Sequence, residues 1–209
     1  HTSMLDQDAV GDVEGDVEAF RNELDADERA TMVDLCVAAT GEEPQLVDHG
    51  PEGRYVEGVV RLRRGLSDAR ARHRIGHELG HLFYERVEYA GADLEERCDL
   101  FGAALCMPRR AARAALRSVG HRVHGLAAHF GVTQSVSLLR IGEVTGRPVG
   151  LLCVRGPLAR GAGSAWPAAS ALVAGLRQGR ADVHPVRISD EPNRLGLMVD
   201  RGTWLAMSA

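Results

Sequence analysis

The sequence predicts an α+β protein that is mostly helical, with a small sheet and a β-containing unit at its C-terminal end. Up to residue 145, apolar residues recur mainly at helical spacing, whereas beyond Gly146 the chain breaks into short apolar runs between Gly, Pro and Asp turns. The chain has 209 residues, of which 44% are hydrophobic, so it can bury a core. We therefore expect a folded globular protein.

Composition narrows the class of protein. No run of about 18 apolar residues occurs and the N-terminus is acidic, so we expect neither a membrane helix nor a secretory signal. We therefore expect a cytoplasmic location. The four cysteines form no CxxC pair, which indicates reduced thiols rather than disulfides or a zinc knuckle. A net charge of -4 argues against a general binder of nucleic acids or membrane surfaces.

Two helices should precede the first strand. The residues before Met4 resemble the remnant of a tag and are left out of the fold prediction. The first helix lies within residues 6–28, where apolar residues recur at helical spacing, namely Val17, Phe20 and Leu24. A second helix runs from about residue 27 to residue 39, and Gly41 is placed to end it.

The next elements are a strand and two helices. Residues 55–62 alternate in polarity and predict the strand. Ser67 can cap a helix that continues to about Glu85. Asp93 opens the other helix, with Glu96 three residues later as in a capping box.

The remaining chain completes the expected organisation. Residues 109–122 predict a basic helix, and residues 126–143 predict two short helices, of which Thr133 caps the second. Short strands and a helix near residues 168–177 should follow. We therefore expect three parts: a core over residues 4–108, a segment like a helix-turn-helix over residues 109–147 and a β-containing unit over residues 148–209.

His77, Glu78 and His81 form an HExxH motif in the helix after Ser67. Residues four apart stand on one face of a helix, so the two imidazoles can bind one metal ion. Imidazole is a common zinc ligand, and catalytic zinc sites keep one position for water. Glu78 can reach that water and is a candidate general base rather than a ligand. The alternative is that these are two surface histidines on an ordinary helix. The flanking apolar residues argue against it, because they predict a helix with one side facing a core: Ile75, Leu79 and Leu82.

The helix that Asp93 opens carries the other candidate groups. Glu95 and Asp99 lie four residues apart on one stripe, beside an apolar stripe of Leu94, Cys98, Phe101 and Leu105. Glu95 is the natural third zinc ligand. Asp99, one turn on, can accept the second ring N–H of a zinc-bound histidine. The alternative is that these acids, with Glu96, form a solvated helix face.

Together the two helices resemble the ImmA/IrrE-type zinc metallopeptidases, a family of the thermolysin-like group that uses HExxH and a distant Glu. The resemblance covers roughly residues 66–146. It rests on Arg72–Leu82, on a Glu-x-x-Ala-Asn-x-Phe-Ala-x-x-Leu-Leu-Met-Pro pattern at residues 95–108 and on a Leu-Ala-x-x-Phe-Gly-Val-Ser-like segment at residues 126–133. The chain departs from that pattern at Cys98, Asp99, Gly102 and Cys106, which replace Ala, Asn, Ala and Leu. Thermolysin-like enzymes use Asp at the second of these positions, and the other changes keep small or apolar character.

The resemblance implies a zincin-like metallopeptidase core, a Zn²⁺ cofactor and a zinc-dependent endopeptidase activity on a protein. It is consistent with zinc on His77, His81 and Glu95, and with Glu78 as the catalytic base. Known substrates of the family are helix-turn-helix repressors, so the resemblance implies regulatory proteolysis of such a partner. The proton donor is not assigned, and the nearest candidates in sequence are Tyr84 and Tyr89.

Two other functions compete with this one. A zinc-binding regulator or toxin-like protein would keep the metal without proteolysis, but a structural site needs no base beside it, which Glu78 would be. A DNA-binding regulator would use residues 126–143. Only Arg140 is basic between Thr133 and Glu143, so we expect no direct binding of nucleic acid.

Overall fold

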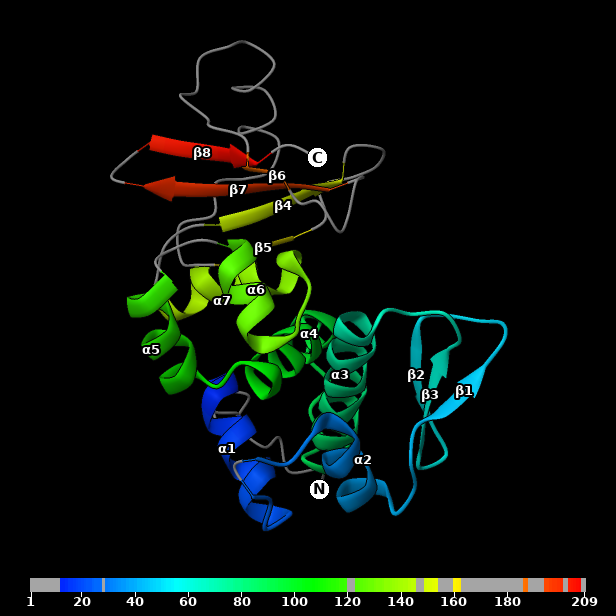
Figure 1. Ribbon diagram of the computed structural model, residues 1–209. Coiled ribbons are helices and arrows are strands. Elements are labelled where there is room, and N and C mark those ends of the chain that lie inside the picture. The colour runs from blue at the N-terminus through cyan, green and yellow to red at the C-terminus, as the bar shows by residue number, and fades with distance from the viewer. Residues whose placement is uncertain are drawn as a thin grey trace. The chain divides into compact units, whose positions relative to one another are not determined.

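The computed structural model in Figure 1 describes residues 12–27, 29–119, 123–145, 149–153, 160–162, 186–187, 194–200 and 203–207. The chain divides into two compact units, His1–Arg109 and Arg110–Ala209. Helices and a small sheet make up the described part of the first unit, which is the α+β class that the sequence predicts. The division into three parts stays a prediction.

Two helices open the first unit close to where the sequence predicts them. α1 (Val13–Glu23) follows Asp12, whose carboxylate caps the helix. α2 (Met32–Thr40) starts with a capping box and ends at Gly41, whose φ of 81° is left-handed. α1 lies within the segment that the apolar spacing predicts, whereas α2 starts about five residues later and ends one residue later than predicted.

The small sheet consists of β1 (Gln45–Val47), β2 (Gly53–Val56) and β3 (Val59–Arg63). Its strand order is β1-β3-β2, with β1 parallel and β2 antiparallel to β3. The single strand expected over residues 55–62 is wrong, because Glu57 and Gly58, at φ 52° and 83°, turn the chain back into a hairpin. β2 is consequently an edge strand, and β1 was not predicted.

Two long helices carry the HExxH motif and the acids after it, namely α3 (Asp68–Arg86) and α4 (Leu94–Cys106). They cross at two glycines. A Cβ added to Gly76 would lie 2.8 Å from the Cα of Gly102, and one added to Gly102 would lie 2.7 Å from the backbone nitrogen of His77. The two backbones therefore meet without side chains between them.

The starts of α3 and α4 differ from expectation. Ser67 and Asp93 occupy the N-cap positions, but neither side chain caps its helix. Asp93 has φ -95° and ψ 11°, which is not the extended conformation from which a side chain caps. Its carboxylate accepts a hydrogen bond from the Tyr89 hydroxyl instead. The capping box expected between Asp93 and Glu96 is thus wrong.

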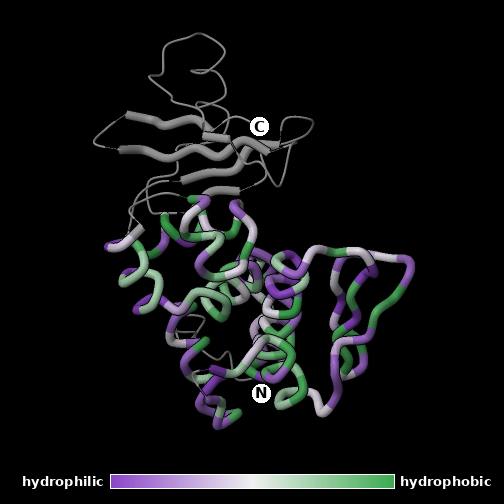
Figure 2. Tube along the Cα trace, viewed as in Figure 1, coloured by the Kyte–Doolittle hydropathy of each residue, from purple (hydrophilic) through white to green (hydrophobic). Residues whose placement is uncertain are grey.

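Aromatic rings form the centre of the first unit. The ring centroid of Phe101 on α4 lies 5.5 Å from that of Phe20 on α1 and 5.4 Å from that of Phe83 on α3. In Figure 2, hydrophobic and hydrophilic positions alternate along the helices, as amphipathic helices require. This core fixes α3 and α4 against each other.

The described part of the second unit contains the helices α5 (Arg109–Val119), which starts at the boundary, α6 (Val123–Phe130) and α7 (Gln134–Thr145). Its strands are β4 (Val149–Cys153), β5 (Arg160–Ala162), β6 (Val186–Arg187), β7 (Arg194–Asp200) and β8 (Thr203–Met207). Their order is β5-β4-β7-β6, and β8 also pairs with β7. Thr133 caps α7 as expected, through its hydroxyl and the Val136 amide at 3.3 Å. The helix expected near residues 168–177 lies outside the described residues.

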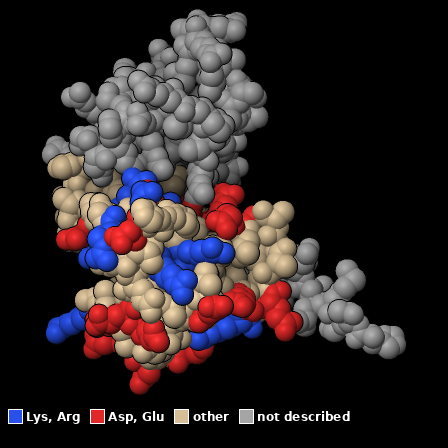
Figure 3. Space-filling model, turned by 90° about the vertical axis from the view of Figure 1, so that its right-hand side faces the viewer, with Lys and Arg blue, Asp and Glu red and all other residues tan. Residues whose placement is uncertain are grey.

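The surface carries charges of both signs. On the face that Figure 3 presents, acidic and basic side chains are interspersed among the described residues. Within the part of the chain that the structure describes, no helix is long and apolar enough to cross a membrane.

Candidate metal centre

A cleft of about 750 Å³ lies in the first unit. One wall is the edge strand β2 with the loop before it, and the other is α3 with the start of α4. The lining residues are Pro51, Glu52, Gly53, Arg54, Tyr55, Arg74, His77, Glu78, His81, Glu85, Tyr89, Leu94 and Glu95. The three polar residues of the HExxH motif therefore all line the cleft: His77, Glu78 and His81.

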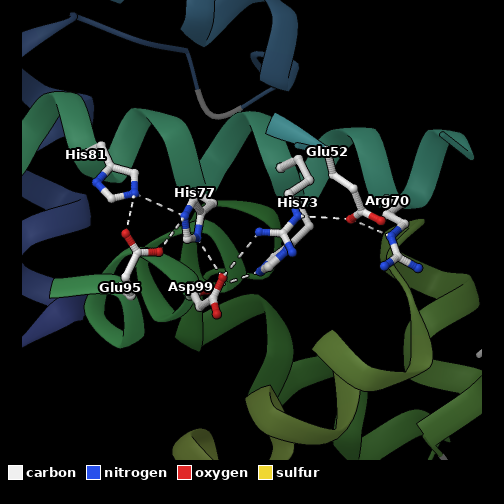
Figure 4. A network of polar contacts seen from close by, with 8 residues as sticks. Glu52, Arg70, His73, His77, His81, Glu95 and Asp99 are labelled. Carbon is white, nitrogen blue, oxygen red and sulfur yellow. Dashed lines mark hydrogen bonds and ion pairs between the residues drawn. The ribbon is translucent and has the colours of Figure 1, made fainter. Parts of the chain in front are cut away.

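Three side chains from α3 and α4 point toward one another in this cleft (Figure 4). The Nε2 atoms of His77 and His81 are 3.1 Å apart. Oxygens of Glu95 lie 3.5 Å from the former nitrogen and 3.3 Å from the latter. Ligands that bind zinc tetrahedrally at about 2.0–2.1 Å are themselves about 3.3 Å apart. The three donor atoms thus have the spacing that one such ion requires.

Asp99 contacts His77 at the ring nitrogen that does not face His81. Its Oδ1 lies 2.6 Å from Nδ1 of His77, and both side chains are about 5% exposed. A carboxylate only accepts, so this contact favours the tautomer with the proton on Nδ1. Nε2 of His77 is then left as an electron-pair donor that faces His81 and Glu95.

Charged residues extend this network toward the sheet (Figure 4). NH1 of Arg74 lies 3.9 Å from Oδ1 of Asp99, while its Nε lies 3.3 Å from Glu52, which also pairs with Arg70 at 2.8 Å. Burial opposes ionisation of Glu52, but the hydrogen bonds and charges of Arg70 and Arg74 hold the pKa of its carboxyl below the usual value. Sequence reasoning missed Glu52 and Arg74, because these partners lie 18 to 25 residues apart in the chain.

Glu78 lies in the same cleft and is 4% exposed. Its Oε2 accepts a hydrogen bond from the backbone amide of Tyr55 on β2 at 2.8 Å. A Cβ on Gly53 would lie 2.7 Å from Oε1, so the strand can approach this carboxylate only because residue 53 is glycine. No local pattern in the sequence indicated that β2 would contact Glu78.

The two tyrosines suggested by the sequence occupy different places. Tyr84 is fully buried, and its hydroxyl donates to Asp16 at 2.8 Å, away from the metal cluster. Tyr89 lines the cleft and donates to Asp93. Tyr55, which the sequence did not single out, lines the cleft as well. Tyr84 is thus held outside the site, whereas Tyr55 and Tyr89 border it.

Two cysteines on α4, Cys98 and Cys106, are buried and free. Burial, with the charges of Glu95 and Glu78, raises the pKa of the Cys98 thiol to about 12. Burial also raises the pKa of the Cys106 thiol to about 12. Both thiols therefore stay protonated at neutral pH, and neither belongs to the cluster of His77, His81 and Glu95.

Arg140 and Ser137 of α7 are buried in the helix pair α6–α7. Arg140 is 1% exposed and pairs with Glu143 at 2.8 Å, so it is not available to a phosphate. Ser137 is also buried and donates to the backbone oxygen of Val123 at 3.0 Å. Both polar residues therefore serve packing within the helix pair.

The chain is similar to known proteins in sequence and in fold. Residues 34–141 match the model of a family described as Peptidase_M78, IrrE N-terminal-like domain. Among solved structures, a Mycobacterium tuberculosis transcriptional regulator is similar in fold, with a TM-score of 0.61 and 13% sequence identity, over 90% of this chain and 69% of that one. No curated protein matches the chain.

Proposed function

Since the chain belongs to the IrrE N-terminal-like family, Peptidase M78, we propose that it is a zinc-dependent endopeptidase that cuts a specific protein. The observation that carries this proposal is the cluster of His77, His81 and Glu95, with donor atoms 3.1–3.5 Å apart. Two imidazoles and one carboxylate are the ligand set of many catalytic zinc sites. Three protein ligands leave one position for water or substrate.

Zinc held by these residues would polarise a peptide carbonyl and make a water molecule more acidic. Asp99 would keep His77 in the tautomer that binds the ion. Because Glu95 comes from a different helix, the site depends on how α3 and α4 pack and not on the motif alone.

Glu78 would take the proton from the attacking water. Its carboxylate lies beside the proposed ligands, and the amide of Tyr55 holds one of its oxygens at 2.8 Å, which fixes the direction of the other. Burial keeps the carboxylate away from bulk solvent. A positioned base of this kind typically contributes about 10²- to 10⁴-fold to the rate.

The substrate would lie along β2 in an extended conformation. β2 is an outer strand of its sheet and forms one wall of the cleft, so a peptide could pair with it as an added strand. We infer a folded intracellular protein, and a transcriptional repressor in particular, because the resemblance to ImmA/IrrE-type peptidases implies such a partner. Cleavage at one or two sites would then be regulatory.

The test is to incubate the zinc-loaded protein with purified candidate repressors and, separately, with unfolded casein. We expect one or two cuts in a repressor and almost none in casein. Glu78→Gln should keep the fold and the zinc but lose about 10²- to 10⁴-fold in cleavage rate, since an amide cannot take the proton.

Two outcomes would contradict the proposal. Full cleavage by Glu78→Gln would remove Glu78 from the mechanism, and digestion of casein at many sites would remove the specificity. If both the wild type and Glu78→Gln bind zinc but cut none of the repressors, the result would favour the zinc-binding regulator without proteolytic activity.

A further inference from the structure

The third proposed ligand lies on a first helical turn that has no side-chain cap. Glu95 is the second residue of α4, and its side chain is 69% exposed. Asp93, at the N-cap, does not cap the helix. First turns without a cap tend to fray, so another contact must hold Glu95 beside the histidines.

Arg97, two residues on, anchors this turn. Its guanidinium carbon lies 5.3 Å from the ring centroid of Tyr84 and 5.1 Å from that of Tyr89. NH2 of Arg97 lies 2.9 Å from Oδ2 of Asp16 on α1. The flat cation is therefore held by two aromatic rings and one carboxylate.

Asp16 connects both ligand-bearing helices. It is 6% exposed, and the oxygen that binds Arg97 also accepts the Tyr84 hydroxyl at 2.8 Å. Tyr84 follows His81 by three residues on α3, just as Arg97 follows Glu95 by two on α4. One buried carboxylate thus ties α3 and α4 together less than one turn beyond the proposed ligands.

We propose that Asp16 is a positioning residue for the metal centre, which holds Glu95 within reach of His77 and His81 through Arg97 and Tyr84. The proposal rests on the ligand assignment of the proposed function. α1 lies before residues 34–141, the part of the chain that the family model matches.

A matched control exists on the same helix. Glu23 of α1 pairs with Arg86 of α3 at 2.7 Å, with both side chains at least 38% exposed. This pair also joins α1 to α3, and within the described residues the other hydrogen bond of Arg86 goes to the backbone oxygen of Ala39 and not to α4. Loss of the Glu23 pair should therefore weaken helix docking without moving Glu95.

The experiment compares Asp16→Asn, Glu23→Gln and Glu95→Ala with the wild type. Zinc affinity is measured by competition with a chelator, at a temperature where circular dichroism shows each variant folded. The visible spectrum of the Co²⁺-loaded protein reports the coordination geometry. We expect Asp16→Asn to lose about 10- to 100-fold in affinity and to shift the Co²⁺ spectrum toward that of Glu95→Ala. Glu23→Gln should match the wild type in both.

The outcomes separate the two proposals. Wild-type zinc affinity in Glu95→Ala would contradict the ligand assignment itself. Loss in Glu95→Ala with wild-type affinity and spectrum in Asp16→Asn would overturn the positioning role alone. If Asp16→Asn does not fold, Arg97→Lys replaces it, because an ammonium keeps the charge but loses the flat contact with both rings. Wild-type affinity in that variant would equally overturn the proposal.

Discussion

Asp99 shows how much a single buried carboxylate can decide at the residue scale. Its Oδ1 lies 2.6 Å from Nδ1 of His77, which favours the tautomer with the proton on Nδ1, and 3.9 Å from the guanidinium of Arg74. It is 5% exposed, so its charge is stabilised by these groups rather than by water. The same residue therefore orients a proposed ligand and links it to the charges along the cleft.

Asp99→Ala should weaken zinc binding about 10- to 100-fold, because the imidazole loses the acceptor that orients it. Asp99→Asn keeps an acceptor oxygen of the same size and should lose less. Chelator competition measures both affinities. Equal affinity in Asp99→Ala and the wild type would reduce Asp99 to a packing residue, and Glu96→Ala, at an exposed neighbour on α4, serves as the unaffected reference.

The close approach of α3 and α4 decides the site at the element scale. Gly76 and Gly102 let the two backbones touch, which brings Glu95 and Asp99 of one helix to the histidines of the other. A larger residue at this crossing would have to separate the helices. The obstacle is backbone, which cannot rotate away as a side chain can.

Gly102→Ala should destabilise the fold by about 1–3 kcal/mol, because the new Cβ would lie 2.7 Å from the backbone nitrogen of His77. This loss should outweigh the higher helix propensity of alanine. The substitution should weaken zinc binding as well, since the two ligand helices move apart. Urea unfolding and chelator competition measure the two effects.

Gly15→Ala is the matched control for this substitution. Its new Cβ would meet nothing closer than 3.5 Å, so the same change within a helix should be neutral or slightly stabilising. Unchanged stability and zinc affinity in Gly102→Ala would show that the helix crossing tolerates a methyl group.

For the whole molecule, the metal should act as a link between the two helices. An ion bound only by the folded chain stabilises it by about 2.7 kcal/mol at one hundred times the dissociation constant. For a chain of this length, that corresponds to a rise in Tm of about 5–10 °C. Removal of zinc should therefore lower the Tm of the whole protein.

Calorimetry with zinc and with excess chelator tests this expectation. His77→Ala should show no difference between the two conditions, because the proposed site is lost. The expectation fails if the wild type melts at one temperature with and without zinc, or if His77→Ala keeps the full difference.

The amino-acid sequence by itself determined the α+β class, most helices of the first unit and the candidate ligands. These features depend on residues within a few turns of one another: the four-residue spacings of His77 with His81 and of Glu95 with Asp99. The roles of these residues stay predictions, but their meeting in one cluster is a feature of the structure.

Only the tertiary structure decided which groups support that cluster. Tyr55 reaches Glu78 across 23 residues, and Arg97 reaches Asp16 across 81. The turn at Glu57 and Gly58, which makes β2 an edge strand, was hidden because polarity alternates through it. Periodicity indicates which side of an element is buried, but a contact between distant segments depends on how whole elements pack, which no local spacing contains.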